Sequence, residues 1–320
     1  MVLTARSMFS KHTWNYLAAG LAFLVIPVSS FYEQKSDTFS APDSVLLFAR
    51  PYYDVRVVTP DHSLIISSPV DVPANSGVFN YPSISRKGDF IAWGFAVQGH
   101  PRPTRFALGV YSIAEQRWKT YGDFDDIGAT AFSPDGSKIA FVAEEPERRD
   151  AFLIFDVASG KMTHVPHPSG IPERATLSWS PDGKRLVVET HRSEKASLIV
   201  VLDPITGDVQ PVGDGSDPAW SPTGEWIAYY DLLGKKCMLV HPDGTGTKVA
   251  KHVGGGFFVH REFGWGLVWS PDGKKLLLNE MKGDLRYIDI DVVLLDLETG
   301  RATTKSKNGP PVFGWVSRGK

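Results

Sequence analysis

Cysteine is almost absent from this sequence of 320 residues, since Cys237 is the single one. A lone cysteine cannot form a disulfide within the chain, which excludes a cross-linked scaffold. Cys237 lies directly before the apolar run Met238-Leu239-Val240. We therefore expect a partly buried and unreactive thiol.

Net charge and catalytic motifs are also lacking. The formal net charge is −2, and basic residues are scattered rather than gathered in a stripe, so nucleic acid is not expected as a partner. No Gly-x-Ser-x-Gly motif is present, and no α/β-hydrolase domain is expected after the last repeat described below. The sequence therefore favours a protein that is not an enzyme.

What the sequence does contain is a phrase that returns at intervals of about 40–50 residues. An aromatic residue precedes Ser-Pro-Asp-Gly or Ser-Pro-Thr-Gly, and a short apolar run follows. Four good copies lie at 132–136, 179–183, 220–224 and 269–273, and a degenerate copy lies at 84–88. Such a period indicates one supersecondary unit copied around or along an axis. We expect the aromatic residues to be equally buried between neighbouring units, namely Phe132, Trp179, Trp220, Trp269 and Trp315.

The phrase predicts a tight turn between two β-strands. Proline presets φ at the first corner, aspartate can accept bonds from nearby backbone N–H groups, and glycine adopts positive φ. The flanking runs are rich in Val, Ile, Trp, Phe and Tyr, which favours strands. Each repeat has a second half of similar shape, so one repeat is predicted to be four antiparallel strands, A to D.

Four-stranded sheets of this length are typical of propeller blades. Six C–D halves are visible, starting near Val55, Leu108, Phe152, Leu198, Met238 and Val292. Only five A–B halves are complete. Residues 45–48 and 312–315 supply the two strands of the sixth, one from each end of the chain. The sequence thus predicts an all-β, six-bladed β-propeller whose terminal strands close one blade and remove the exposed edges.

The Ser-Pro-Asp-Gly phrase and its apolar run resemble the PD40 (WD40-like) repeat of the TolB propeller family. The resemblance covers roughly residues 44–315 and implies a six-bladed propeller. TolB itself carries an α/β domain before its propeller. This chain has only the short segment 31–43 there, so the resemblance is limited to the propeller, assigned to 44–320.

The first thirty residues resemble a secretory leader. Arg6 and Lys11 precede an apolar run over 17–28, and Val28-Ser29-Ser30 offers small residues for cleavage. The run is short for a membrane span, although residues 14–32 together could form an uncleaved anchor. We predict a signal peptide or membrane anchor at 1–30 and an exported, periplasmic or extracytoplasmic protein, with a cytoplasmic location as the remaining alternative.

A binding site is expected on one face of the propeller. The A–B and C–D turns are short and alike, whereas the B–C and D–A loops on the other face are long and irregular. Function commonly lies on loops held by a rigid scaffold. The alternative is that the aromatic residues of these loops pack between blades as core. The candidate binding residues are His100, Arg102, Arg192, His260, Arg261, Trp265 and Tyr287.

Three motifs superficially suggest ligands. His164 and His167 are three residues apart, and Asp123, Asp125 and Asp126 form an acidic group, but neither set has enough ligands nearby for zinc or calcium. We interpret both as solvated turns. The segment 244–248 resembles a phosphate loop but is predicted to be a C–D turn before a strand. No metal and no cofactor are therefore predicted.

Two functions from different classes are consistent with these features. The favoured one is an exported, non-enzymatic propeller that binds a protein or another cell-envelope partner through its loop-rich face. The alternative is a lactonase-like or glycan-processing enzyme with its site at the channel mouth. A weaker third interpretation is a sensor domain anchored by an uncleaved leader.

Overall fold

The computed structural model describes residues 44–50, 54–58, 63–67, 81–98, 105–167, 175–193, 196–231, 235–253, 266–282, 289–307 and 311–317. The chain divides into two compact units, Met1–Lys35 and Ser36–Lys320, and all described residues belong to the second. The predicted leader (1–30) and linker (31–43) lie outside the described residues. Within the described part, no helix is long and apolar enough to cross a membrane.

All regular elements of the described residues are strands, and the paired strands are antiparallel. Four of the sheets contain four strands each. They are β23 (Val312–Ser317), β1 (Ser44–Arg50), β2 (Asp54–Val58) and β3 (Ser63–Ser67); β4 (Ser83–Ile84), β5 (Phe90–Gln98), β6 (Arg105–Ser112) and β7 (Arg117–Phe124); β8 (Asp126–Phe132), β9 (Lys138–Glu145), β10 (Arg148–Asp156) and β11 (Met162–His164); and β19 (Leu267–Trp269), β20 (Lys275–Lys282), β21 (Asp289–Asp296) and β22 (Ala302–Ser306).

The remaining described strands form one seven-stranded sheet. Its order is β12 (Leu177–Trp179), β13 (Leu186–Ser193), β14 (Ala196–Leu202), β15 (Val209–Trp220), β16 (Ile227–Asp231), β17 (Lys236–Val240) and β18 (Lys248–His252). Strand β15 is shared, because its first half pairs with β14 and its second half pairs with β16. Gly215 begins the second half, where a Cβ would lie 2.0 Å from the Tyr230 carbonyl oxygen. Glycine is therefore required where the strand changes partners.

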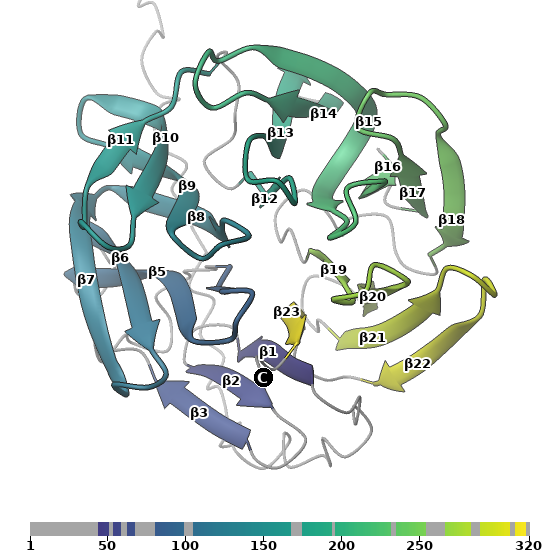
Figure 1. Ribbon diagram of the computed structural model, residues 1–320, viewed down its shortest axis with the longest axis horizontal. Helices are drawn as coiled ribbons and strands as arrows, with labels where there is room; N and C mark the ends of the chain where they lie inside the picture. Colours follow the sequence, from purple (N-terminus) through teal and green to yellow (C-terminus); the bar gives the residue numbers. More distant parts are fainter. Residues whose placement is uncertain are drawn as a thin grey trace, which may run out of the picture. The chain divides into compact units, whose positions relative to one another are not determined.

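Within this unit the sheets follow one another around a central space in chain order, with strands such as β8, β12, β19 and β23 nearest the centre (Figure 1). The two ends of the ring meet in one sheet. Strand β23 pairs with β1, with Leu46 opposite Trp315 and Val45 opposite Val316. This confirms the predicted pairing of the two terminal strands, which leaves no open edge between the first and last sheets.

The core lies between neighbouring sheets. One cluster joins Val110 of β6 to Phe141 of β9 and Phe155 of β10. The next joins Phe152 of β10 to Leu186 of β13. Apolar side chains on both faces of a strand are buried in this way, which explains why the strands have nearly continuous apolar runs. The rigid ring that results positions the turns described next.

Candidate functional site

Four of the five repeated aromatic residues end a strand, namely Phe132, Trp179, Trp220 and Trp269, whereas Trp315 lies within β23. Trp179, Trp220 and Trp269 are 6%, 5% and 7% exposed, whereas Phe132 and Trp315 are half-buried. Each of the three tryptophans packs in a cluster with residues of the preceding four-stranded unit. The prediction of burial between units is thus confirmed for these three, and the other two are less covered.

Two of these tryptophans also link the units by hydrogen bonds. Trp179 Nε1 donates to the Ala131 carbonyl at 3.1 Å, and Trp269 Nε1 donates to the Ala219 carbonyl at 2.9 Å. Trp220 Nε1 is buried with no hydrogen-bond partner in the structure, although the Arg185 guanidinium lies 5.4 Å from its ring centroid. Equivalent positions in the repeat therefore differ in polar contacts.

The turns that follow are held by serine and aspartate side chains. Ser133 Oγ donates to Asp135 Oδ1 at 2.6 Å, and Ser180 and Ser270 donate in the same way to Asp182 and Asp272 at 2.5 Å. The bond from Ser133, with further bonds from Ser137, lowers the pKa of Asp135 to about 2. The same serine bond lowers the pKa of Asp182 and of Asp272.

Successive turns also stack on each other. Gly183 has φ of +68°, and a Cβ there would lie 3.7 Å from Pro134 Cδ of the preceding turn. Gly224 lies in the same way above Pro181. The glycine of each of these two turns therefore lies close to the proline of the preceding turn.

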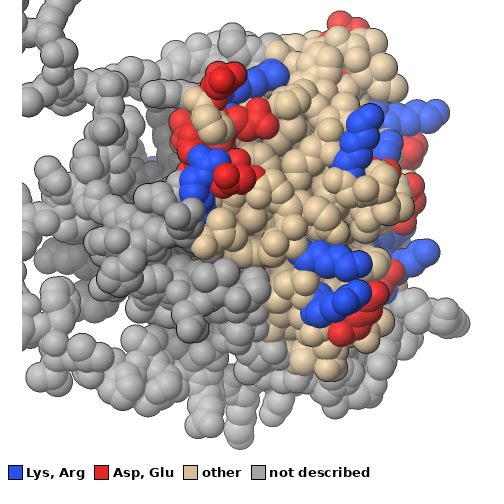
Figure 2. Space-filling model, turned by 90° about the vertical axis from the view of Figure 1, so that its left-hand side faces the viewer, with Lys and Arg blue, Asp and Glu red and all other residues tan. Residues whose placement is uncertain are grey.

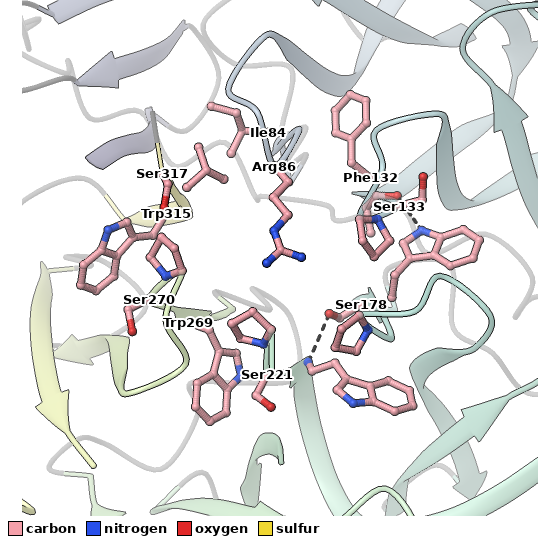
Figure 3. Close-up of a pocket in the computed structure, with 18 of the residues that line it drawn as sticks. Ile84, Arg86, Phe132, Ser133, Ser178, Ser221, Trp269, Ser270, Trp315 and Ser317 are labelled. Atoms are coloured by element: carbon pink, nitrogen blue, oxygen red, sulfur yellow. Dashed lines mark hydrogen bonds between the residues drawn. The ribbon is translucent and has the colours of Figure 1, made fainter. Parts of the chain in front are cut away.

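The turns enclose a cavity of about 410 Å³ at this end of the ring (Figure 3). Nine of the residues that line it are aromatic or proline. They are Phe132, Trp179, Trp220, Trp269 and Trp315, with Pro134, Pro181, Pro222 and Pro271. Serine residues from several turns add polar atoms, among them Ser133, Ser178, Ser221, Ser270 and Ser317. The cavity therefore lies on the face of the short turns, and not on the loop-rich face where the sequence predicts binding.

The degenerate repeat contributes the charged part of the wall. Arg86 and Lys87 stand where the other repeats have proline and aspartate or threonine, and both line the cavity. Figure 3 shows the Arg86 side chain extending into the middle of the ring of labelled residues. The turn keeps its shape, because Gly88 N donates to the Ser85 carbonyl at 2.8 Å, as Gly136 N does to Ser133. Asp89 replaces the missing aspartate by accepting a hydrogen bond from Ser85 Oγ.

This arrangement can bind an apolar group that carries an anion. Rings supply contact area, and an arginine among them can donate two parallel hydrogen bonds to a carboxylate or phosphate. Within the described ranges, no group of three or more His, Cys, Asp or Glu side chains is placed to hold a metal ion. The groups that the cavity offers to a ligand are rings, hydroxyls and the cations Arg86 and Lys87.

The predicted loop residues are mostly not located. His100, Arg102, His260, Arg261, Trp265 and Tyr287 lie outside the described residues. Arg192 is in strand β13, at an irregularity of register between His191 and Ser193. The use of the loop-rich face therefore stays a prediction.

The histidines and aspartates considered as ligands have other partners. His164 Nε2 lies 2.9 Å from Glu145 Oε2, and His167 Nε2 lies 3.4 Å from the Arg148 guanidinium. Asp123 and Asp125 both pair with Arg105 at 2.5 Å. Residues 244–247 belong to the connection between strands β17 and β18, which pair as a hairpin, and Lys248 begins β18, so the predicted C–D turn before a strand is confirmed.

The outer side of the ring has mixed charges. In Figure 2, Lys, Arg, Asp and Glu side chains gather along two edges with both signs together, and the band between them is mostly uncharged. Ion pairs such as Arg117–Glu115 at 2.6 Å and Lys274–Glu298 at 2.8 Å agree with this mixture. This view offers no single-sign patch for a highly charged partner.

Sequence signals for the cavity existed but were missed. The substitution of Arg86-Lys87 for the Pro-Asp of other repeats was visible, as was Asp89 two positions beyond the expected aspartate. Asp89 keeps the bond to the serine, so the turn is retained although Arg86 and Lys87 differ from the other repeats.

Comparison with known proteins supports the fold. No protein-family model matches the chain. A curated Bacillus subtilis protein named "Uncharacterized peptidase YuxL" is 28% identical over 126 residues, which cover 35% of this chain and 19% of that protein. The chain therefore spans about a fifth of the length of that relative.

Solved structures are similar over most of the chain. TolB from Acinetobacter baumannii matches with a TM-score of 0.63 and 16% identity, covering 85% of this chain and 66% of that chain, just under two thirds. A putative TolB from Agrobacterium tumefaciens matches with a TM-score of 0.61 and 18% identity, covering 82% and 91%. A nidogen/laminin complex contains a chain that matches with a TM-score of 0.60 and 12% identity, covering 85% and 97%. These similarities show a TolB-like β-propeller fold.

Proposed function

We propose that this chain is an exported, non-enzymatic, six-bladed β-propeller that binds a protein partner in the cell envelope. The blade count follows from dividing β15 between its two partners, which makes the seven-stranded sheet two four-stranded blades beside the four others. The repeated turn phrase supports this division, because one copy precedes each of β13 and β16.

The cavity on the short-turn face is the observation that carries the proposal. Tryptophan and arginine are among the residue types that contribute most to binding energy at protein interfaces. Here they come from several repeats and surround one opening. A surface of this composition, held by a closed ring of sheets, is suited to binding without any rearrangement of the scaffold.

A protein partner is also in keeping with the solved structures that share the fold. One of these is described as a complex between two proteins, nidogen and laminin. The match to a protein named as a peptidase spans too little of that protein to bring its activity here. We keep the loop-rich face, with Arg261 and Trp265, as the second proposed contact surface.

Export is proposed from the sequence. Arg6, Lys11 and the apolar run that follows favour secretion, and residues 14–32 provide a membrane tether if the leader is not cleaved.

Site-specific photo-crosslinking in intact cells tests the function and the face together. A photoreactive amino acid is placed at Lys87 on the cavity rim, at Trp265 in the loop-rich face, or at Ser159. Ser159 is the control, because it is exposed in the β10–β11 turn and does not line the cavity. We expect a discrete adduct from Lys87, from Trp265 or from both, and none from Ser159. Absence of an adduct from both test positions would refute a stable protein partner.

A further inference from the structure

We infer that the cavity on the short-turn face binds the free C-terminal end of a partner polypeptide, with its carboxylate on Arg86 and an apolar last side chain among the rings. This inference rests on the proposed protein-binding function and names the chemistry of that partner. It depends on three features: the charge of the residues that line the cavity, the absence of a described partner for the Arg86 side chain, and the size of the opening.

The charge of the wall has one sign. Arg86 and Lys87 are the only charged residues among the described residues that line the cavity. The turn carboxylates nearby do not line it, because Asp135, Asp182 and Asp272 are each bonded to the serine of their own turn. An anion entering the cavity therefore meets two cations and no lining carboxylate, and the surrounding rings lower the local polarity, which strengthens the attraction.

Arg86 is free to bind a ligand. No residue in the described ranges forms an ion pair or hydrogen bond with its side chain. The bond from Ser85 Oγ to Asp89 keeps the turn intact without help from Arg86 or Lys87. Backbone donors reinforce this, since Asp89 N and Phe90 N donate to Ser85 Oγ at 3.1 and 3.0 Å. The arginine is thus not needed for the turn, and its planar guanidinium matches a carboxylate in two-bond geometry.

The opening suits a chain end. A volume of about 410 Å³ lies near the lower end of the roughly 300–1,000 Å³ range of ligand pockets. Turns and strand ends surround it around the axis (Figure 3). A hairpin loop would have to fit two strands into this space. A terminal residue fits alone and brings its own carboxylate.

The hydroxyl groups leave the guanidinium as the main polar contact. Ser133 and Ser270 Oγ are bonded within their turns, and Ser178 Oγ accepts from Trp220 N at 3.2 Å. The rest of the wall contains the aromatic and proline rings, the aliphatic residues Ile84, Ala131 and Val316, and the polar residues Lys87, Ser221 and Ser317. We therefore expect preference for an apolar or aromatic terminal side chain and discrimination against an amidated end.

Peptide binding measured by calorimetry tests this directly. The probes are N-acetyl-Ala-Ala-Pro-X peptides with X as Phe, Leu, Val or Pro, each with a free carboxylate or a C-terminal amide. A third set, N-acetyl-Ala-Asp-Pro-X amides, carries the carboxylate on a side chain instead. We expect at least one free acid to bind, with its amide and its Asp-containing amide at least tenfold weaker.

Variants of the protein test whether Arg86 is the residue that binds the peptide carboxylate. Arg86→Ala is expected to weaken the free acid at least tenfold and to abolish the preference for acid over amide. Arg86→Pro, which restores the residue of the other repeats, should do the same. Lys184→Ala is the matched control, because Lys184 is an exposed cation in the corresponding turn of another repeat and does not line the cavity, and it should bind as the wild type does. Unchanged thermal unfolding of each variant establishes that the fold is retained.

Three results would overturn the inference: equal binding of acid and amide, retention of the preference in Arg86→Ala, or failure of every free acid to bind the wild-type protein at millimolar concentration. Tighter binding of the Asp-containing amide would also overturn it, in favour of a side-chain carboxylate. These results would leave the proposed protein-binding function standing. That function is refuted only if neither Lys87 nor Trp265 gives a protein adduct in the crosslinking experiment.

Discussion

The tryptophans that precede the turns allow the hydrogen bonds between units to be measured against an internal reference. Trp269 and Trp220 occupy equivalent positions and are 7% and 5% exposed, but only the Trp269 indole donates a hydrogen bond, to the Ala219 carbonyl at 2.9 Å. Substitution by phenylalanine removes the same atoms from both. The difference between the two variants therefore reports the hydrogen bond.

The magnitude follows from the net value of a buried hydrogen bond. Such a bond contributes about 0.5–1.5 kcal/mol to stability, and Trp220→Phe also removes a buried N–H that has no partner, so Trp269→Phe should lower the free energy of unfolding by at least that much more than Trp220→Phe. Trp179→Phe should behave as Trp269→Phe does, because its indole bonds the Ala131 carbonyl. Trp220 also has Arg185 at 5.4 Å from its ring, so all three variants are best compared in an Arg185→Ala background.

Urea unfolding followed by tryptophan fluorescence and by circular dichroism supplies the assay. Coincident transitions from the two probes are needed for a two-state free energy. If Trp220→Phe costs as much as Trp269→Phe, the indole bond contributes nothing between units. A larger cost for Trp220→Phe would show that ring packing, and not the hydrogen bond, distinguishes the repeats.

Three further predictions concern the thiol, the turn carboxylates and the chain start. Cys237 is fully buried and burial raises its pKa to about 12, so it should not react with a thiol reagent in the native protein and should react fully in urea; fast labelling of native protein would contradict this. Asp135 has a pKa of about 2 in the folded state, below the value near 3.9 of an unfolded chain, so its stabilisation is present above about pH 4 and is lost as pH falls toward 2. The free energy of unfolding, measured as a function of pH, should therefore fall more steeply in that window for the wild type than for Asp135→Asn. Parallel curves would show that the Asp135 carboxylate does not contribute. Mass spectrometry of the protein from its native source should find a chain starting near Phe31, and an intact Met1 on cytosolic protein would reject export.

The sequence was informative about the scaffold because the propeller is built from local units. Each turn phrase fixes a hairpin through its own proline, aspartate and glycine, and the period between copies exposes the repeat. The pairing of β1 with β23 was also predictable, because an incomplete half at each end has one complementary solution in a closed ring. The join within β15 was not predicted, since nothing local marks Gly215 as the point where one strand serves two partners.

The candidate site was harder to predict, because it depends on how units pack. Sequence irregularity directed attention to the loop-rich face, where most candidate residues lie outside the described ranges. The short turns looked purely structural one at a time. Only their stacking, Gly183 on Pro134 and Gly224 on Pro181, gathers the rings around a common opening.

The sequence by itself thus determined the turns, the strands and the repeated unit of this protein, because backbone propensity and a fixed period act over a few residues. The tertiary structure alone decided that Arg86 faces a ring-lined cavity, and that indoles at equivalent positions differ in their hydrogen bonds. Both depend on contacts between residues some fifty or more positions apart in the chain, which closure of the ring brings within a few ångströms.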